Sequence, residues 1–181
     1  MEGLRQRLCE LIRTQALKRG QFVLSSGRVS SYYLDGRLIT LSPEGAYLTG
    51  KVIFDLLKDS SVQAIGGPTL GADPMAAAVA LVSHLEGRPM AAFIVRKEPK
   101  KHGRGRWVEG PLEPGMRVAI LDDVITTGES LLRAIEAVKQ EGCIVEKVIV
   151  LVDREEGGRE VLAAQGYELT AIFNLLDLGI N

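Results

Sequence analysis

The sequence predicts an α/β fold with a central parallel sheet flanked by helices. From residue 64 onward, short apolar runs alternate with segments of helical periodicity, which is typical of parallel strands joined by helical crossovers. The run at residues 148–152 is continuously apolar, as in strands that are covered on both faces. Glycine or polar residues follow several of these runs, and ligands bind beyond the carboxyl ends of strands in such sheets.

The N-terminal third contains two expected helices and a hairpin. Apolar residues recur at helical spacing at Leu4, Leu8, Leu11 and Ile12. Because Gly20 follows the basic pair at 18–19, the pattern predicts a helix over residues 3–19. Apolar runs at 22–24 and 32–34 flank a Ser-Ser-Gly-Arg turn and predict a hairpin or small flap. Ser42-Pro43 is a typical helix start, and this helix is expected to reach about Leu57.

The remaining two thirds predict alternating strands and helices. The expected strands cover residues 64–66, 90–95, 117–121, 144–152 and 169–173. The expected helices cover residues 74–85, 130–141 and 158–165. Residues 96–110 are charged and rich in glycine, without a useful period, and predict a long loop. Since the chain shows no internal repeat and no linker composition, a single domain over residues 1–181 is expected.

The composition excludes several classes of protein. Hydrophobic residues make up 46% and charged residues 25%, which excludes a disordered chain. The 22 basic and 23 acidic residues give a net charge of −1, so no nucleic-acid or membrane partner is expected, and anion binding must come from local clusters. The N-terminus lacks the apolar centre of a signal peptide, and Cys9 and Cys143 are isolated thiols. A cytoplasmic location is therefore expected.

Residues 118–130 are the most informative segment of the chain. An apolar strand ends in Asp122 and Asp123, and a turn then leads into a helix. Hydroxyl side chains on this turn are Thr126, Thr127 and Ser130. Free amides at a helix start bind phosphate, whereas paired carboxylates suit sugar hydroxyls or a cation. The segment thus predicts a site for a phosphorylated sugar; the alternative is a solvated acidic turn with a capping hydroxyl.

A second cluster, at residues 96–106, is dense in cations although the whole chain is almost neutral. A mobile cationic loop can close over a polyanion and stabilise charge on a leaving group. Two alternatives remain, a solvated charge run and a nucleic-acid contact, but Trp107 is the only adjacent aromatic residue that could stack on a base. Two other phosphate-binding motifs do not fit: the glycine pair at 66–71 lacks the Lys-Ser/Thr of a P-loop, and residues 102–105 lack a third glycine.

These two segments carry a family resemblance. Residues 118–130 resemble the phosphoribosyl-pyrophosphate (PRPP) signature of the type I phosphoribosyltransferases, which specifies the sugar donor and not the acceptor. The cationic segment resembles the catalytic loop R-K-x-x-K-x-H-G of the orotate phosphoribosyltransferase family. The matching residues are Arg96, Lys97, Lys100, His102 and Gly103. Further similar pieces are the substrate flap at 22–33, the pyrophosphate loop at 66–72 and the strand exit at 152–154.

The resemblance implies a type I phosphoribosyltransferase fold with a small N-terminal substrate flap, or hood, at about residues 20–40 and a mobile catalytic loop at 96–110. It implies transfer of the phosphoribosyl group from PRPP to orotate, giving orotidine 5′-monophosphate and pyrophosphate in pyrimidine synthesis. It also implies Mg²⁺ held mainly by substrate and water, with no protein ligands, and a homodimer in which the catalytic loop crosses to the partner's site.

The resemblance assigns roles residue by residue. The expected catalytic residues are Lys97, Lys100, His102, Asp122 and Asp123. The expected PRPP-binding residues are Arg96, Lys97, Lys100, His102, Asp122, Asp123, Val124, Ile125, Thr126, Thr127, Gly128, Glu129 and Ser130. The expected orotate-binding residues are Tyr33, Leu34, Thr126 and Arg154. One departure stands out, because Ser25 occupies a flap position where many members carry lysine.

Two other functions remain open. Another PRPP-dependent nucleobase phosphoribosyltransferase would share the donor signature, but the catalytic-loop pattern and Arg154 favour orotate. A nucleotide-sensing, RNA-binding regulator could use the same fold. The net charge of −1 and the scarcity of basic residues outside the loop weigh against it.

Overall fold

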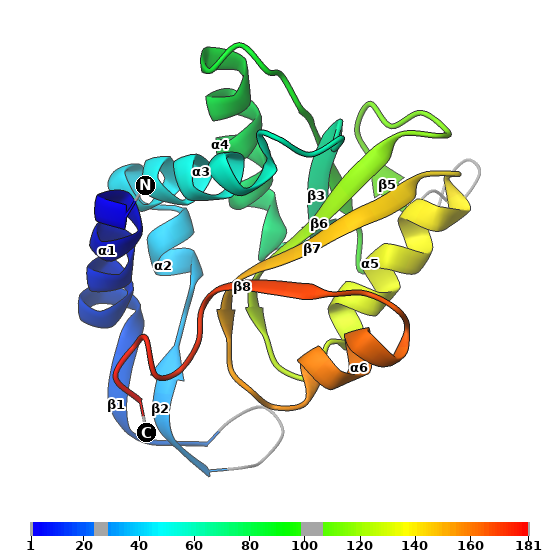
Figure 1. Ribbon diagram of the computed structural model, residues 1–181. Helices are drawn as coiled ribbons and strands as arrows, with labels where there is room; N and C mark the ends of the chain where they lie inside the picture. The colour runs from blue at the N-terminus through cyan, green and yellow to red at the C-terminus, as the bar shows by residue number, and fades with distance from the viewer. Residues whose placement is uncertain (1, 24–28, 99–106, 181) are drawn as a thin grey trace.

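The structure is a computed structural model that describes residues 2–23, 29–98 and 107–180. In this part of the chain a mostly parallel six-stranded sheet lies beside a two-stranded hairpin (Figure 1). The strands of the sheet are β3 (Ala64–Pro68), β4 (Ala91–Val95), β5 (Val108–Glu109), β6 (Arg117–Ile125), β7 (Ile144–Asp153) and β8 (Leu169–Phe173). The predicted fold class is confirmed. Only the β4–β5 pair is antiparallel, and β5 was not predicted because its two residues lie in a charged loop.

Helices cover both faces of the sheet (Figure 1). They are α1 (Glu2–Leu11), α2 (Arg37–Thr40), α3 (Pro43–Leu57), α4 (Ala72–Leu85), α5 (Glu129–Gln140) and α6 (Gly158–Ala164). Alternate residues of β6 face the two sides: Leu121 packs in the core shared with α1, α3 and α4, and Ile120 packs in the core under α5 and α6. The predicted start of α3 is confirmed, because the Ser42 hydroxyl accepts from the Gly45 N–H at 3.1 Å. Within the described ranges, every helix is too short or too polar to cross a membrane.

The N-terminal helix is shorter than predicted. Helix α1 ends at Leu11, a π-helical turn follows over Ile12–Ala16, and Leu17–Val23 form strand β1. This strand pairs antiparallel with β2 (Val29–Leu34), which confirms the predicted hairpin. The expectation of a helix to residue 19 was wrong because Leu17, Lys18 and Arg19 pair with β2, a contact that local periodicity does not reveal.

Strand β6 is longer than predicted. The sequence indicated an end at Leu121, but pairing with β7 continues to Ile125, which lies opposite Asp153. Asp122 and Asp123 therefore lie within the strand and not after it. The added length holds both carboxylates on a fixed, paired backbone.

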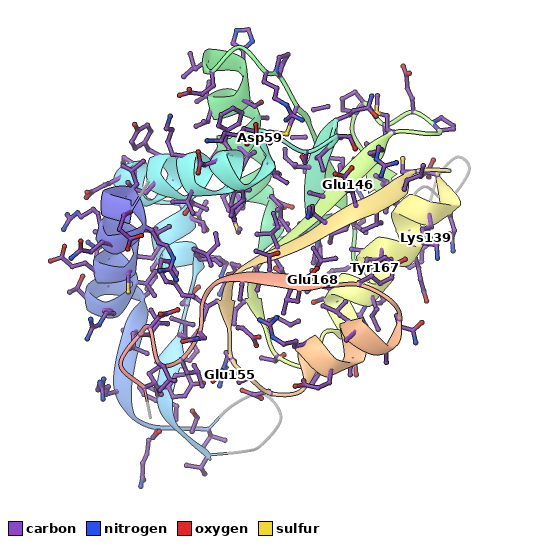
Figure 2. The ribbon with its side chains drawn as sticks, viewed as in Figure 1. Asp59, Lys139, Glu146, Glu155, Tyr167 and Glu168 are labelled. Carbon is purple, nitrogen blue, oxygen red and sulfur yellow. The ribbon has the colours of Figure 1, made fainter. Side chains whose placement is uncertain are left out.

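The strand order β5-β4-β3-β6-β7-β8 creates a switch point between β3 and β6. The chain leaves β3 toward β4 on one side and leaves β6 toward β7 on the other, so the loops after β3 and β6 diverge. Ligands bind in the crevice that forms at such a point. Figure 2 marks the two ends of β7: Glu146 lies near its start, and Glu155 follows its end, on the edge of the sheet where this crevice opens.

Candidate functional site

Backbone from two other segments lies directly against the carboxylates of β6. A Cβ atom added to Gly71, in the loop after β3, would lie 2.2 Å from Asp122 Oδ1 and 2.5 Å from Asp123 Oδ1. A Cβ atom added to Gly36, after β2, would lie 3.0 Å from Asp123 Oδ2. Such distances leave no room for a side chain at Gly71. The switch point thus brings the exits of β2, β3 and β6 together around the two carboxylates.

The two carboxylates are poorly compensated. Asp122 is only 7% exposed; its Oδ1 accepts from the Asp123 N–H at 3.0 Å and its Oδ2 accepts from the Ser130 hydroxyl at 3.3 Å. Burial raises the pKa of Asp122 well above its ordinary value, and the charge of Asp123 raises it further. Burial also raises the pKa of Asp123. Hydroxyl donors or a nearby cation would satisfy this pair.

Arg37, whose charge lowers the pKa of Asp123, is already engaged. Arg37 donates through Nε to Asp35 Oδ1 at 2.9 Å and influences Asp123 only through its charge. Asp35 and Arg37 together carry no net charge, so the excess negative charge of the pair persists. In the described ranges no group of three potential metal ligands occurs. The carboxylates can therefore hold hydroxyls or support a cation whose other ligands come from elsewhere.

The turn after β6 leads through a glycine into a helix, as the sequence predicted. Gly128 adopts a φ of +83°, and α5 begins at Glu129, one residue before the predicted start. No side chain caps this helix, so the amides of its first turn keep their hydrogen-bonding capacity. Gly158 packs beneath the turn, where an added Cβ atom would lie 2.5 Å from the Thr126 carbonyl oxygen.

A cavity of about 230 Å³ joins several of the predicted site residues. Its lining is Leu34, Asp35, Gly36, Arg37, Leu70, Gly71, Lys97, Asp123 and Val124. A neighbouring cavity of about 490 Å³ also contains Lys97, together with Arg96, Thr69 and Asp73. Arg96 forms an ion pair with Glu109, with Nη1 3.4 Å from Oε1. Lys100 and His102 lie outside the described residues.

Arg154 lies beside the exit of β6 because its N–H donates to the Ile125 carbonyl oxygen at 3.1 Å. Its guanidinium is held on two sides. Nη2 lies 2.9 Å from Glu156 Oε1, and Cζ lies 5.0 Å from the centre of the Tyr32 ring. Nε also donates to the Tyr32 hydroxyl at 3.2 Å. This fixes a cation, with its planar donors, against Tyr32 and Glu156.

Sequence reasoning selected Tyr33 and missed Tyr32. Tyr33 is 39% exposed and its ring lies 5.8 Å from that of Phe22, whereas Tyr32 contacts Arg154. Leu34 is buried and reaches the cavity beside Asp123. Successive side chains of a strand point to opposite faces, so Tyr32 shares a face with Leu34 and Tyr33 does not. That alternation is the signal that could have identified Tyr32.

Comparison with known proteins gives a consistent result. Residues 48–169 match the family model described as a phosphoribosyl transferase domain. Orotate phosphoribosyltransferase of Aquifex aeolicus is 49% identical over 177 residues, covering 96% of this chain and 97% of that protein.

Solved structures agree with the sequence relatives. The crystal structure of Mycobacterium tuberculosis orotate phosphoribosyltransferase with Fe(III) dicitrate has a TM-score of 0.87 and 41% identity, covering 98% of this chain and 99% of that chain. The same enzyme in complex with PRPP has a TM-score of 0.83 and 38% identity, with the same coverage.

Proposed function

The chain belongs to the orotate phosphoribosyltransferase family, and on that premise we propose how its residues transfer the 5-phosphoribosyl group from PRPP to orotate. The reaction gives orotidine 5′-monophosphate and pyrophosphate and serves pyrimidine biosynthesis. The observation that carries the proposal is the meeting of the β3 loop, the paired carboxylates and the β6–α5 turn at one switch point.

The exit of β6 binds the sugar of the donor. Asp122 and Asp123 accept hydrogen bonds from the ribose hydroxyls, which add donors that stabilise the charge of the buried pair. The turn from Val124 to Ser130 cradles the 5′-phosphate with its amides and hydroxyls. As the bond from C1 to pyrophosphate breaks, positive charge develops on the ring, and the two nearby carboxylates stabilise it.

Cationic side chains receive the leaving group. Lys97 lines the cavity that contains Asp123 and also the larger neighbouring cavity, which Arg96 lines as well. We assign both to pyrophosphate, together with Lys100 and His102 of the catalytic loop. These groups stabilise the charge that accumulates on pyrophosphate in the transition state.

Arg154 binds the acceptor. Its guanidinium presents planar donors that suit the carboxylate or carbonyl edge of orotate. Tyr32 and Glu156 hold that guanidinium in place, so little side-chain freedom is lost on binding. Leu34 and Thr126 complete the proposed acceptor side, and Tyr33, on the opposite face of β2, is not assigned to it. As N1 of orotate bonds to C1 and the bond from C1 to pyrophosphate breaks, the N1 proton passes to water.

Magnesium fits the same site. The buried carboxylate pair favours a cation nearby, which supports Mg²⁺ held mainly by substrate oxygens and water. Bound Mg²⁺ supplies charge neutralisation on the pyrophosphate oxygens. Asp122 and Asp123 support it through the ribose hydroxyls that they bind.

We further propose that the enzyme is a homodimer with a shared active site. A groove of about 660 Å³ between α3 and α4 is lined by apolar side chains, and Leu41, Tyr47, Leu81 and Leu85 are all more than half exposed. Large exposed apolar surfaces are typical of association sites. The groove shares Leu41 and Pro74 with a cavity that reaches Asp35 and Leu70, so a second copy seated there would lie next to the site.

We place the enzyme in the cytoplasm. Cys9 and Cys143 both carry free thiols, which supports a reducing compartment.

The assay for this function is the loss of orotate absorbance in the presence of PRPP, with and without Mg²⁺. We expect orotate to be consumed only when donor and metal are both present, with no turnover of adenine, hypoxanthine or xanthine. Turnover of a purine base in place of orotate would favour a different acceptor. Salt-dependent RNA binding without turnover of any base would favour a regulator on the same fold.

A further inference from the structure

The loop between β3 and α4, residues 69–71, crosses the carboxylates of the site. Its first residue is fixed to the neighbouring strand, because the Thr69 N–H donates to the Val95 carbonyl oxygen at 2.9 Å. Its last residue, Gly71, lies directly against the carboxylates of Asp122 and Asp123. The path of this short loop therefore decides how much room lies above the two carboxylates.

Asp73, in the first turn of α4, contacts the start of this loop with one oxygen only. Its Oδ2 accepts from the Thr69 hydroxyl at 2.6 Å. Its Oδ1 is buried and has no hydrogen-bond partner among the described residues. A carboxylate oxygen that is buried without a donor is unfavourable, so a sequence selected for stability alone would not favour this arrangement.

Asp73 lines two cavities, and each of them also contains a residue of this loop. It lines the cavity that contains Arg96 and Lys97, and it also lines a cavity of about 690 Å³ that contains Leu70. The hydrogen bond to Thr69 is the described contact that couples this side chain to the loop.

We propose that Asp73 is a positioning residue for the donor. Through its hydrogen bond to Thr69 it fixes the path of residues 69–71 over Asp122 and Asp123. The inference rests on the proposed function, in which the β3 loop, the paired carboxylates and the β6–α5 turn meet around PRPP. Asp73 acts through the Thr69 hydroxyl and the loop backbone. Its loss should weaken donor binding and leave the acceptor side, at Arg154, unchanged.

The test compares variants that remove or keep the hydrogen bond. Thr69→Val removes the hydroxyl with little change of shape, and Asp73→Ala removes the acceptor. We expect each to raise the KM for PRPP roughly tenfold, because a hydrogen bond to a charged group is lost. The KM for orotate should stay unchanged. Thr69→Ser, which keeps the hydroxyl, should restore the wild-type value, and Asp73→Asn, which keeps one acceptor oxygen, should have a smaller effect than Asp73→Ala.

Ser83 provides a control at the other end of the same helix. Its hydroxyl donates to the Ala80 carbonyl oxygen at 2.7 Å and accepts from the Met90 N–H at 2.9 Å. Ser83→Ala should lower the melting temperature without raising the KM for PRPP. If Thr69→Val behaves in the same way, or leaves every constant unchanged, the positioning role is wrong.

A separate measurement keeps this inference distinct from the proposed function. If the wild-type protein fails to consume orotate, the proposed acceptor is wrong. Calorimetric titration with PRPP then compares the wild type with Thr69→Val directly. Weaker binding to the variant supports the positioning role, and equal affinity overturns it.

Discussion

Tyr32 and Arg154, which are 122 positions apart in the sequence, form a single unit: the guanidinium carbon lies 5.0 Å from the ring centre, and Nε donates to the hydroxyl at 3.2 Å. This contact joins the hairpin to the exit of β7. The hairpin and the guanidinium of Arg154 are therefore positioned together, and a substitution in one should change the position of the other.

Replacing Tyr32 tests this coupling. Tyr32→Phe keeps the ring and removes the hydrogen bond, so we expect the KM for orotate to rise by roughly tenfold or less. Tyr32→Ala also removes the cation–π contact and should raise it further. The KM for PRPP should be unchanged in both. Tyr167→Phe, on the other side of the sheet, is the matched control. If the KM for orotate is unchanged in both Tyr32 variants, the coupling is contradicted.

The close approach of Gly71 to the carboxylates predicts a sharp steric effect. Gly71→Ala places a methyl group 2.2 Å from Asp122 Oδ1, so the loop or the strand must shift. We expect a loss of stability of about 1–3 kcal/mol, as for other overpacked sites, together with a large loss of activity. Gly3→Ala, where nothing lies within 4 Å, is the control and should leave both unchanged. Full activity of Gly71→Ala would mean that the loop does not lie where the structure places it.

Much of the site is encoded locally. In the β6–α5 segment, an apolar run, two carboxylates, hydroxyl residues and Gly128 follow one another within a few positions, and the structure has the predicted turn and helix start. The end of β6 was not predictable in the same way. It depends on pairing between Ile125 and Asp153, and that pairing is set by the sheet and not by neighbouring residues.

The features that sequence reasoning missed are contacts between distant segments. Strand alternation places Tyr32 and not Tyr33 on the same face as Leu34, but the packing of the hairpin decides that this face turns toward Arg154. Likewise, Leu17 to Arg19 continue a helical pattern but pair with β2. The hydrogen bond between Thr69 and Asp73 spans only four residues, yet it requires the loop geometry that strands β3 and β4 impose.

The carboxylate pair predicts a pH-dependent stability of the substrate-free protein. Burial raises the pKa of Asp122 and Asp123, so the folded state binds these protons more tightly than the unfolded state does. Ionisation therefore destabilises the fold. The effect is absent below the unfolded pKa of about 3.9, grows as the pH rises from there to the folded pKa, and is constant above it.

Asp122→Asn and Asp123→Asn should accordingly melt above the wild type at pH 7, and the difference should shrink toward pH 4. A gain of 1 kcal/mol corresponds to about 2–4 °C for a chain of this size. Both variants should also bind PRPP more weakly in calorimetric titration. A lower melting temperature at pH 7 with unchanged PRPP affinity would favour a purely structural acidic turn.

Mixing two inactive variants tests the shared active site. Lys100→Ala alone should lower kcat by about 10²-fold or more, because it removes a charge partner of the leaving group. Arg154→Ala alone should lose orotate binding. If the catalytic loop crosses to the partner's site, heterodimers of the two variants contain one intact site and regain activity. Confirmed heterodimers without activity would place the loop in its own subunit's site.

The central claim is that the exit of β6 holds the ribose and its 5′-phosphate. A crystal structure with PRPP and Mg²⁺ measures this directly. The account predicts ribose hydroxyls within hydrogen-bonding distance of Asp122 and Asp123, and the 5′-phosphate on the amides of residues 127–130. A donor sugar found in another cavity, such as the one between α1 and Asp177, would contradict it.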